Sequence, residues 1–202
     1  MVAVLVPVPA SPAAKLSNAN WQSPTDPDAR IARLKDGRTH LAYNPEHAMD
    51  IDTGAVVAAE VHAADQGDTA TMPDTLANAI DHLTAVDAAP TPEAPAELIA
   101  DKGYHSRDAL KALDGGPWKA RISEPHRDGC SLWHGDDAAR RAVYNNRTRL
   151  LSAVARQAFK LRAELVERGF ALILDRGGMR RDRKSTRLNS SHQCLSRMPS
   201  SA

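Results

Sequence analysis

The stretch from Glu97 to Arg107, ELIADKGYHSR, contains the residue best placed for chemistry, Asp101. A short apolar run from Leu98 to Ala100 precedes this acid, and a glycine turn at Gly103 follows it. In this pattern Asp101 ends a buried strand and faces a turn, which is where open α/β sheets place their functional sites. The pattern therefore indicates a candidate site, although an acid in an ordinary strand-to-helix loop explains it equally well.

A helix is predicted to follow this turn and to hold it in place. Ser106 is expected to be the N-cap, because its hydroxyl can accept a hydrogen bond from a free backbone N–H of the first turn. Asp108 would lie in that first turn, and Leu110 and Leu113 would form the apolar side of the helix. Asp101 would thus lie between a buried strand and a capped helix.

Four segments of the chain resemble one protein family. ADKGYHSR (100–107) closely resembles the second-aspartate motif of bacterial insertion-sequence transposases of the DDE type, which have a ribonuclease-H-like catalytic domain. Three other segments resemble this family in its own order: SPTDPDARIARLKDGRTHLAYNPEHAMDIDTGAVV (23–57), ADQGDT (64–69) and ELVERGFALILDRGGMRR (164–181). Together they extend from about Lys15 to Arg181, and four ordered matches are more specific than any single one.

The resemblance implies an α/β fold, namely a ribonuclease-H-like mixed sheet with flanking helices, here incomplete. We expect a partial catalytic domain over residues 15–181, preceded by an unassigned segment over residues 1–14. An intact relative would hydrolyse the DNA ends of its element and transfer the 3′-hydroxyl to target DNA with Mg²⁺ or Mn²⁺. Such reactions commonly use two metal ions, and oxygen-binding metals require several carboxylates in one place.

By resemblance, Asp101 is the second catalytic and metal-binding acid, and Glu167 is the third. Glu164 is the reserve candidate, because residues three apart share a helix face. We expect the carboxylates of Asp101 and Glu167 to approach within about 8 Å. Without the motif, Glu167 would read as a surface partner of a neighbouring basic residue.

The first acid of the family is missing from its expected place, because residues 1–20 contain no Asp or Glu. Asp50 is a minor candidate for this role, and Asp52 reads better as a hairpin residue. We therefore expect an incomplete triad, a chain truncated at both ends and an inactive fragment.

Basic residues are expected to contact DNA phosphates. The residues best placed for this are Lys102, Arg168, Arg176, Arg180 and Arg181. From residue 138 to residue 181, eleven Lys or Arg residues stand against three acids, which fits a polyanion partner or a solvated helix face. The competing functions are a non-catalytic DNA-binding remnant and a stand-alone nuclease of the same fold.

Other features narrow the setting. The spacings of His40, His47, His62 and His105 match no standard zinc site. Cys130 and Cys194 suggest neither a metal site nor a disulfide framework, which fits a reducing cytoplasm. No apolar run approaches the roughly 20 residues that cross a membrane. The expected partner is DNA, with homo-oligomers possible in intact relatives.

Residues 182–202 read DRKSTRLNSSHQCLSRMPSSA and show neither a helical nor an alternating apolar period. Their composition favours disorder. The strings DRKSTRLNSSH and SRMPSSA also resemble the translation of a common sequencing-library adapter on either side of its index. We therefore interpret this tail as adapter-derived and expect it to pack on nothing.

The remaining elements follow from local patterns. A strand interrupted at Asn44-Pro45 is predicted over residues 39–51, with a hairpin turn at 52–54 and a return strand over 55–62. Residues 30–37 read as a short basic segment that ends in a turn. Residues 65–69 read as a polar loop, and a helix is predicted over 75–86.

The C-terminal half alternates helix and strand. A strand is predicted over 118–122, and one long helical pattern runs over 138–174, with Gly169 as its weak point. Alternating strands and helices of this kind are typical of an α/β arrangement.

Overall fold

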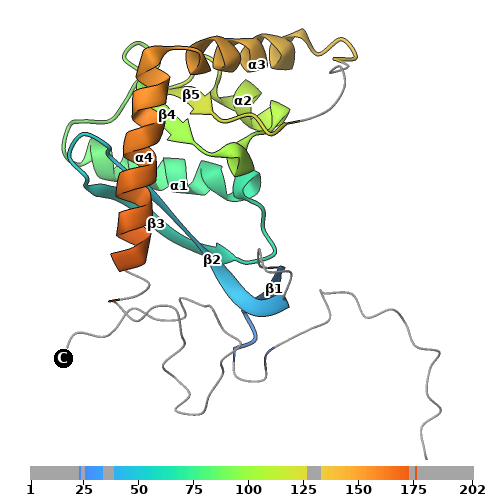
Figure 1. Cartoon of the computed structure of the whole chain (residues 1–202), viewed down its shortest axis with the longest axis vertical. Coiled ribbons are helices and arrows are strands. Elements are labelled where there is room, and N and C mark those ends of the chain that lie inside the picture. Colours follow the sequence, from blue (N-terminus) through green and yellow to red (C-terminus); the bar gives the residue numbers. More distant parts are fainter. Residues whose placement is uncertain (1–22, 24–25, 34–38, 127–132, 173–175, 177–202) are drawn as a thin grey trace, which may run out of the picture.

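The computed structural model describes Ser23, residues 26–33, 39–126 and 133–172, and Arg176. Ten elements follow one another in these residues (Figure 1): β1 (Arg30–Arg33), β2 (Thr39–Met49), β3 (Val56–Ala63), α1 (Asp68–Thr84), β4 (Ala96–Ala100), the 3₁₀-helix η2 (Lys102–Tyr104), α2 (Arg107–Leu113), β5 (Trp118–Ile122), α3 (Asp137–Leu150) and α4 (Ala153–Ala171). The expected α/β class is confirmed.

The first three strands form an antiparallel sheet in the order β1-β2-β3. The predicted hairpin between β2 and β3 is confirmed, and Gly54 in its turn has a positive φ of 74°. The predicted interruption at Pro45 is wrong, because β2 runs unbroken from Thr39 to Met49. Its pairing with β1 ends at Ala42, so at Pro45 β2 has a neighbour on one side only, where a residue without an N–H is tolerated.

The segment that the sequence presented as short and basic contains strand β1. Arg30 to Arg33 pair with Ala42 to Thr39 of β2. The sequence of this strand shows no alternation of apolar and polar residues. Its extended conformation therefore depends on the pairing with β2. Tertiary context has overridden local propensity here.

Strands β4 and β5 pair in parallel, with α2 connecting them. The predicted cap of α2 is confirmed, since Ser106 Oγ accepts a hydrogen bond from the Ala109 N–H at 3.0 Å. The predicted strand over 118–122 is confirmed as well. Among the described strands the two ladders are separate, so backbone hydrogen bonds do not join the antiparallel part of this mixed fold to its parallel part.

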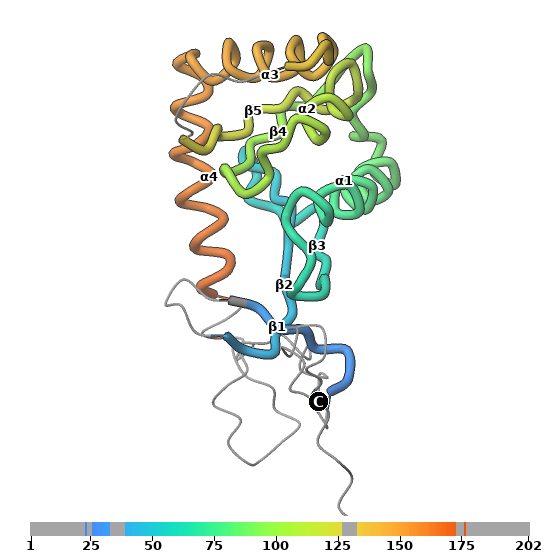
Figure 2. The backbone as a smooth tube through the Cα atoms, turned by 90° about the vertical axis from the view of Figure 1, so that its right-hand side faces the viewer, coloured from blue at the N-terminus to red at the C-terminus, as the bar shows by residue number. Residues whose placement is uncertain are grey.

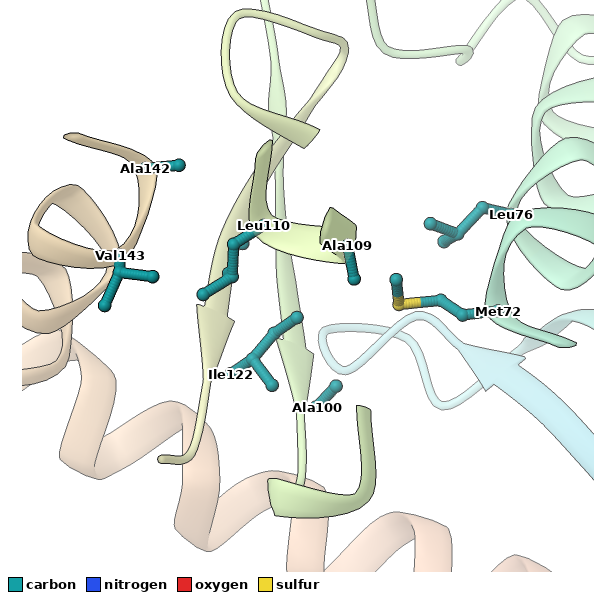
Figure 3. Close-up of a cluster of buried hydrophobic side chains, with 9 residues drawn as sticks. Met72, Leu76, Ala100, Ala109, Leu110, Ile122, Ala142 and Val143 are labelled. Carbon is teal, nitrogen blue, oxygen red and sulfur yellow. The ribbon is translucent and has the colours of Figure 1, made fainter. Parts of the chain in front are cut away.

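The hydrophobic core lies around the parallel pair. Figure 3 shows side chains of α1 approaching β4 and β5 from one side and those of α3 approaching from the other. The core consists mostly of small or medium apolar side chains, namely Met72, Leu76, Ala100, Ala109, Leu110, Ala120, Ile122, Ala142 and Val143. Because these side chains are small, the helices pack close to the strands, which fixes the end of β4.

Helix α1 begins earlier than predicted. Residues 65–69 were expected to be a loop and the helix to begin near Thr75, but α1 begins at Asp68. Asp68 supports this start because an acid in the first turn is favourable to the helix dipole. Pro73 lies inside the helix. Because proline usually interrupts a helix, the sequence around it does not indicate a helix that begins at Asp68.

The predicted single helix over 138–174 is two helices, α3 and α4, separated at residues 151 and 152. Ser152 caps α4, since its Oγ accepts a hydrogen bond from the Ala155 N–H at 3.1 Å. Arg121 of β5 donates from Nη1 to the carbonyl of Arg149 at 2.7 Å and to Ser152 Oγ at 2.8 Å. This buried guanidinium satisfies the end of one helix and the cap of the next, so the break is stabilised by a residue distant in sequence.

Among the polar residues that the structure describes, Asn146 is the one whose replacement we expect to lower the stability of the fold most. It is fully buried, and its amide pairs with both backbone groups of Ile122, at 2.8 Å and 2.9 Å. Asn146→Ala would leave both groups buried without partners, so we expect a loss of roughly 2–4 kcal/mol in the free energy of unfolding, measured by urea denaturation. The control Asn145→Ala removes one exposed contact to Asp114 and should cost less than about 0.5 kcal/mol. Equal losses of stability in the two variants would contradict a stabilising role for the hydrogen bonds between Asn146 and Ile122.

Candidate active site

Asp101 follows the last residue of β4, in extended backbone, and caps η2. Its Oδ1 accepts a hydrogen bond from the Gly103 N–H at 2.9 Å, and its side chain is 54% exposed. The strand therefore places Asp101 at its carboxyl end, and the turn orients the carboxylate toward solvent. This is the location that the sequence predicted for it.

A second carboxylate, that of Asp68 in the first turn of α1, lies beside Asp101. A Cβ built on Gly103 would lie 2.2 Å from Asp68 Oδ2 and 3.2 Å from Asp101 Oδ1. The two oxygens are therefore no farther apart than the sum of these distances, about 5.4 Å. Sequence reasoning did not single out Asp68, because it assigned this residue to a loop.

Tyr104 and Glu46 connect this turn to β2. Burial raises the pKa of the Tyr104 phenol, and the charge and hydrogen bond of Glu46 raise it further, as do the charges of Asp68 and Asp101. Glu46 is itself buried, and its Oε2 lies 3.5 Å from His62 Nε2. The phenol thus remains protonated beside three carboxylates, where it can donate a hydrogen bond.

From the other side, helix α4 brings a cation to Asp101. Arg162 Nη2 lies 3.8 Å from Asp101 Oδ2. Near its C-terminal end α4 packs on β2, where a Cβ on Gly169 would lie 3.2 Å from the methyl carbon of Met49. Burial lowers the pKa of His47 on β2, and the charge of Arg162 lowers it further.

The predicted third acid lies on a different side of α4. Glu167 is five residues beyond Arg162, which is about 140° around the helix axis, and both Glu167 and Glu164 are exposed. Glu164 accepts a hydrogen bond from Arg168 at 2.7 Å. The structure therefore brings Asp68 and Arg162 to Asp101. The approach of Glu167 to Asp101 and its role both stay predictions.

Asp50 follows β2, and its carboxylate serves the hairpin turn. It accepts hydrogen bonds from the Asp52 N–H and the Thr53 hydroxyl, and the bond from Thr53 lowers its pKa most. Asp52 is exposed in the turn, as its hairpin interpretation predicts.

Of the predicted DNA-contacting residues, three are described and exposed: Lys102, Arg168 and Arg176. Arg180 and Arg181 lie outside the described residues. Two further exposed cations, Arg156 and Lys160, lie one turn apart on α4. The C-terminal tail, whose packing was also predicted, lies outside the described residues.

The donor set at the end of β4 fits a hard cation in part. Two carboxylates can supply oxygen ligands, which is the number that Mg²⁺ often takes from a protein while keeping waters. Within the described ranges, no group of three or more His, Cys, Asp or Glu residues could hold a metal ion. Asp68 and Asp101 could therefore supply two oxygen ligands to one divalent ion.

A family model described as "Transposase DDE domain" matches residues 20–198 of the chain. No match was found among curated proteins or among solved structures. The family match confirms the predicted resemblance, and it implies DNA transposition, DNA binding and the use of divalent metal ions. The family match continues into residues 182–198, so the adapter interpretation stays a prediction, as do the domain boundaries at residues 15 and 181.

Among the described residues, none of the helices combines the length and the apolar character that a membrane span requires.

Gly103→Ala should separate the two carboxylates with little loss of stability. The new Cβ would collide with the end of the Asp68 side chain, which can rotate away. We expect the affinity for Mn²⁺, measured by isothermal titration calorimetry, to fall roughly tenfold or more. The control is Gly116→Ala, where the nearest atom is at an ordinary 3.5 Å. Unchanged Mn²⁺ binding by Gly103→Ala would exclude a shared Asp68–Asp101 site.

Tyr104 should make the fold sensitive to alkali. Above its ordinary pKa of 10.0, the unfolded chain loses the phenolic proton while the folded chain keeps it, so rising pH favours unfolding. We expect tyrosinate absorbance to show one of the three tyrosines ionising only on unfolding, and Tyr104→Phe should remove that component. Tyr144→Phe, at a 48% exposed residue, should leave it. Three tyrosines that titrate together in the folded chain would contradict the assignment.

Proposed function

The chain belongs to the transposase DDE-domain family, and we propose that it binds DNA and holds part of a divalent-metal site, but does not cut DNA by itself. The observation that supports this best is the meeting of Asp101 with Asp68 at the end of β4, while the described residues contain no group of three or more His, Cys, Asp or Glu that could hold a metal ion. Two carboxylates suffice to bind one ion weakly, whereas phosphodiester transfer commonly uses two ions.

Asp101 and Asp68 would hold the ion, which we propose to be Mg²⁺ or Mn²⁺, because carboxylate and water ligands suit these cations. Bound there, the ion would polarise a DNA phosphate. The Gly103 N–H fixes the orientation of Asp101. Arg162 offsets part of the negative charge that the two acids gather while no cation is bound.

In an intact relative, Glu167 would complete the site as the third acid, with Glu164 in reserve. This requires a rotation or displacement of α4 from its present position, because Arg162 now occupies the side that faces Asp101. Asp50 is a weaker substitute for the first acid, since its carboxylate already satisfies the turn after β2.

Exposed basic residues would hold the DNA backbone. We include the residues predicted from the sequence and the two cations that α4 exposes: Lys102, Arg156, Lys160, Arg168, Arg176, Arg180 and Arg181. Contacts with phosphates give salt-dependent affinity with little sequence preference.

We further propose that the DNA partner comprises the element ends and the target DNA, that binding takes place in the cytoplasm, and that active relatives work as homo-oligomers. Of the competing functions, the incomplete acid set favours the DNA-binding remnant over a stand-alone nuclease.

The purified chain should bind DNA and leave it intact. We expect the affinity for a DNA duplex, measured by fluorescence anisotropy, to fall steeply with salt, because each phosphate contact contributes about 0.9 to the logarithmic slope. With Mg²⁺ or Mn²⁺, nicking of supercoiled plasmid should not exceed that of Asp101→Asn.

The variant Lys102→Gln separates DNA binding from metal chemistry, because it removes one exposed cation and retains both acids. It should lower the salt slope by about one. Metal-dependent nicking that Asp101→Asn abolishes would show an active enzyme and overturn the proposed inactivity. Binding that is insensitive to salt would overturn the proposed phosphate contacts.

A further inference from the structure

Helix α4 is anchored unevenly along its 19 residues. Its buried residues, Ala155 and Ala158, both lie in its first half, whereas none of residues 161–171 is buried. Figure 2 shows this second half continuing past β4 and running beside β2. Leu161 and Val166 border an apolar cavity of about 900 Å³ there. A helical segment with so few buried contacts opens at a low cost in free energy.

The second half of α4 is connected to the strands by a ring contact and by an ion pair. Phe170 stacks on His47 of β2, with the ring centroids 4.0 Å apart. Arg162 lies nearer the middle of the helix, and its Nη2 is 3.8 Å from Asp101 Oδ2. Arg162 thus connects the weakly packed part of α4 to the turn after β4.

The two oxygens of Asp101 have different neighbours. Oδ1 accepts the hydrogen bond from Gly103 and is the oxygen near Asp68, while Oδ2 faces Arg162. A divalent cation bound between the two acids would therefore share the Asp101 carboxylate with the guanidinium. Cations this close repel each other, and the repulsion grows with the double charge. An exposed ion pair contributes little stability, so the guanidinium would leave when the metal ion binds.

We propose that Arg162 competes with the divalent cation for Asp101, and that binding of the cation releases the second half of α4 from the strands. The inference rests on the proposed metal site of Asp68 and Asp101. Such coupling is reciprocal: the factor by which the metal ion weakens the contact with α4 is the factor by which that contact weakens metal binding. Release also frees the helix that carries Glu167 to rotate, which completion of the acid set in an intact relative requires.

Isothermal titration calorimetry with Mn²⁺ tests the competition. Arg162→Gln removes the competing charge and retains both acids, so it should bind Mn²⁺ roughly three- to tenfold more tightly than the wild-type chain. Arg162→Lys retains a positive charge on a shorter side chain and should give an intermediate affinity. The matched control Arg141→Gln removes the same charge from an exposed ion pair with Asp114, and should leave the affinity at the wild-type value.

Hydrogen exchange of the full chain, followed by mass spectrometry, tests the release without any substitution. Saturating Mn²⁺ should accelerate amide exchange in residues 161–171 of the wild-type chain roughly threefold or more, and exchange in residues 108–113 of α2 should not change. In metal-free Arg162→Gln, residues 161–171 should already exchange faster, and Mn²⁺ should add little.

The possible failures are distinguishable. Equal Mn²⁺ affinities of the wild-type chain and Arg162→Gln would overturn the competition and leave the proposed metal site intact. Absence of Mn²⁺ binding in both chains would overturn the metal site and the competition together. Exchange in residues 161–171 that Mn²⁺ slows or leaves unchanged would overturn the release, and this wild-type measurement decides that question even if Arg162→Gln fails to fold.

Discussion

A single close approach, between the first turn of α1 and the turn after β4, determines where the acids of this domain meet. Gly103 permits it, because any Cβ there would overlap the carboxylate of Asp68. The two elements are held by the same core, in which Met72 of α1 packs with Ala100 of β4. The distance between the two acids is therefore a consequence of core packing, since neither acid contributes to that core.

The charges around this contact are arranged to tolerate two acids while no cation is bound. The negative charge of Asp101 is offset by a hydrogen bond from the Gly103 N–H and by the nearby guanidinium of Arg162. Tyr104 keeps its proton because burial and the three neighbouring carboxylates raise the pKa of its phenol. Carboxylates this close repel each other. In the proposed metal-bound form, a divalent cation would replace Arg162 as the counter-ion of Asp101, so metal binding and the contact of Asp101 with α4 would be coupled.

The sequence predicted elements whose signals are local and missed those that depend on distant partners. The cap at Ser106 and the hairpin glycine at Gly54 lie within a few residues of what they determine, and both were predicted. Strand β1 depends on β2, and the break before α4 depends on Arg121, about thirty residues away. Asp101 was found from its strand and turn, whereas Asp68, although it lies in the family-like segment ADQGDT, was assigned to a loop and not proposed as a site residue.

The apolar pattern of α4 and the family motif disagree about which side of the helix carries Glu167. A 3.6-residue period groups Leu161, Leu165 and Phe170 on the inner side and places Glu167 outside, as the structure has it; the family motif favoured the opposite orientation. Leu161 and Val166 of α4 also line a cavity of about 900 Å³ between β2 and β4, so the apolar side of the helix is only partly packed against the strands. Because Arg162 lies on the same helix, 3.8 Å from Asp101, the packing of α4 over this cavity also sets which of its side chains faces that acid.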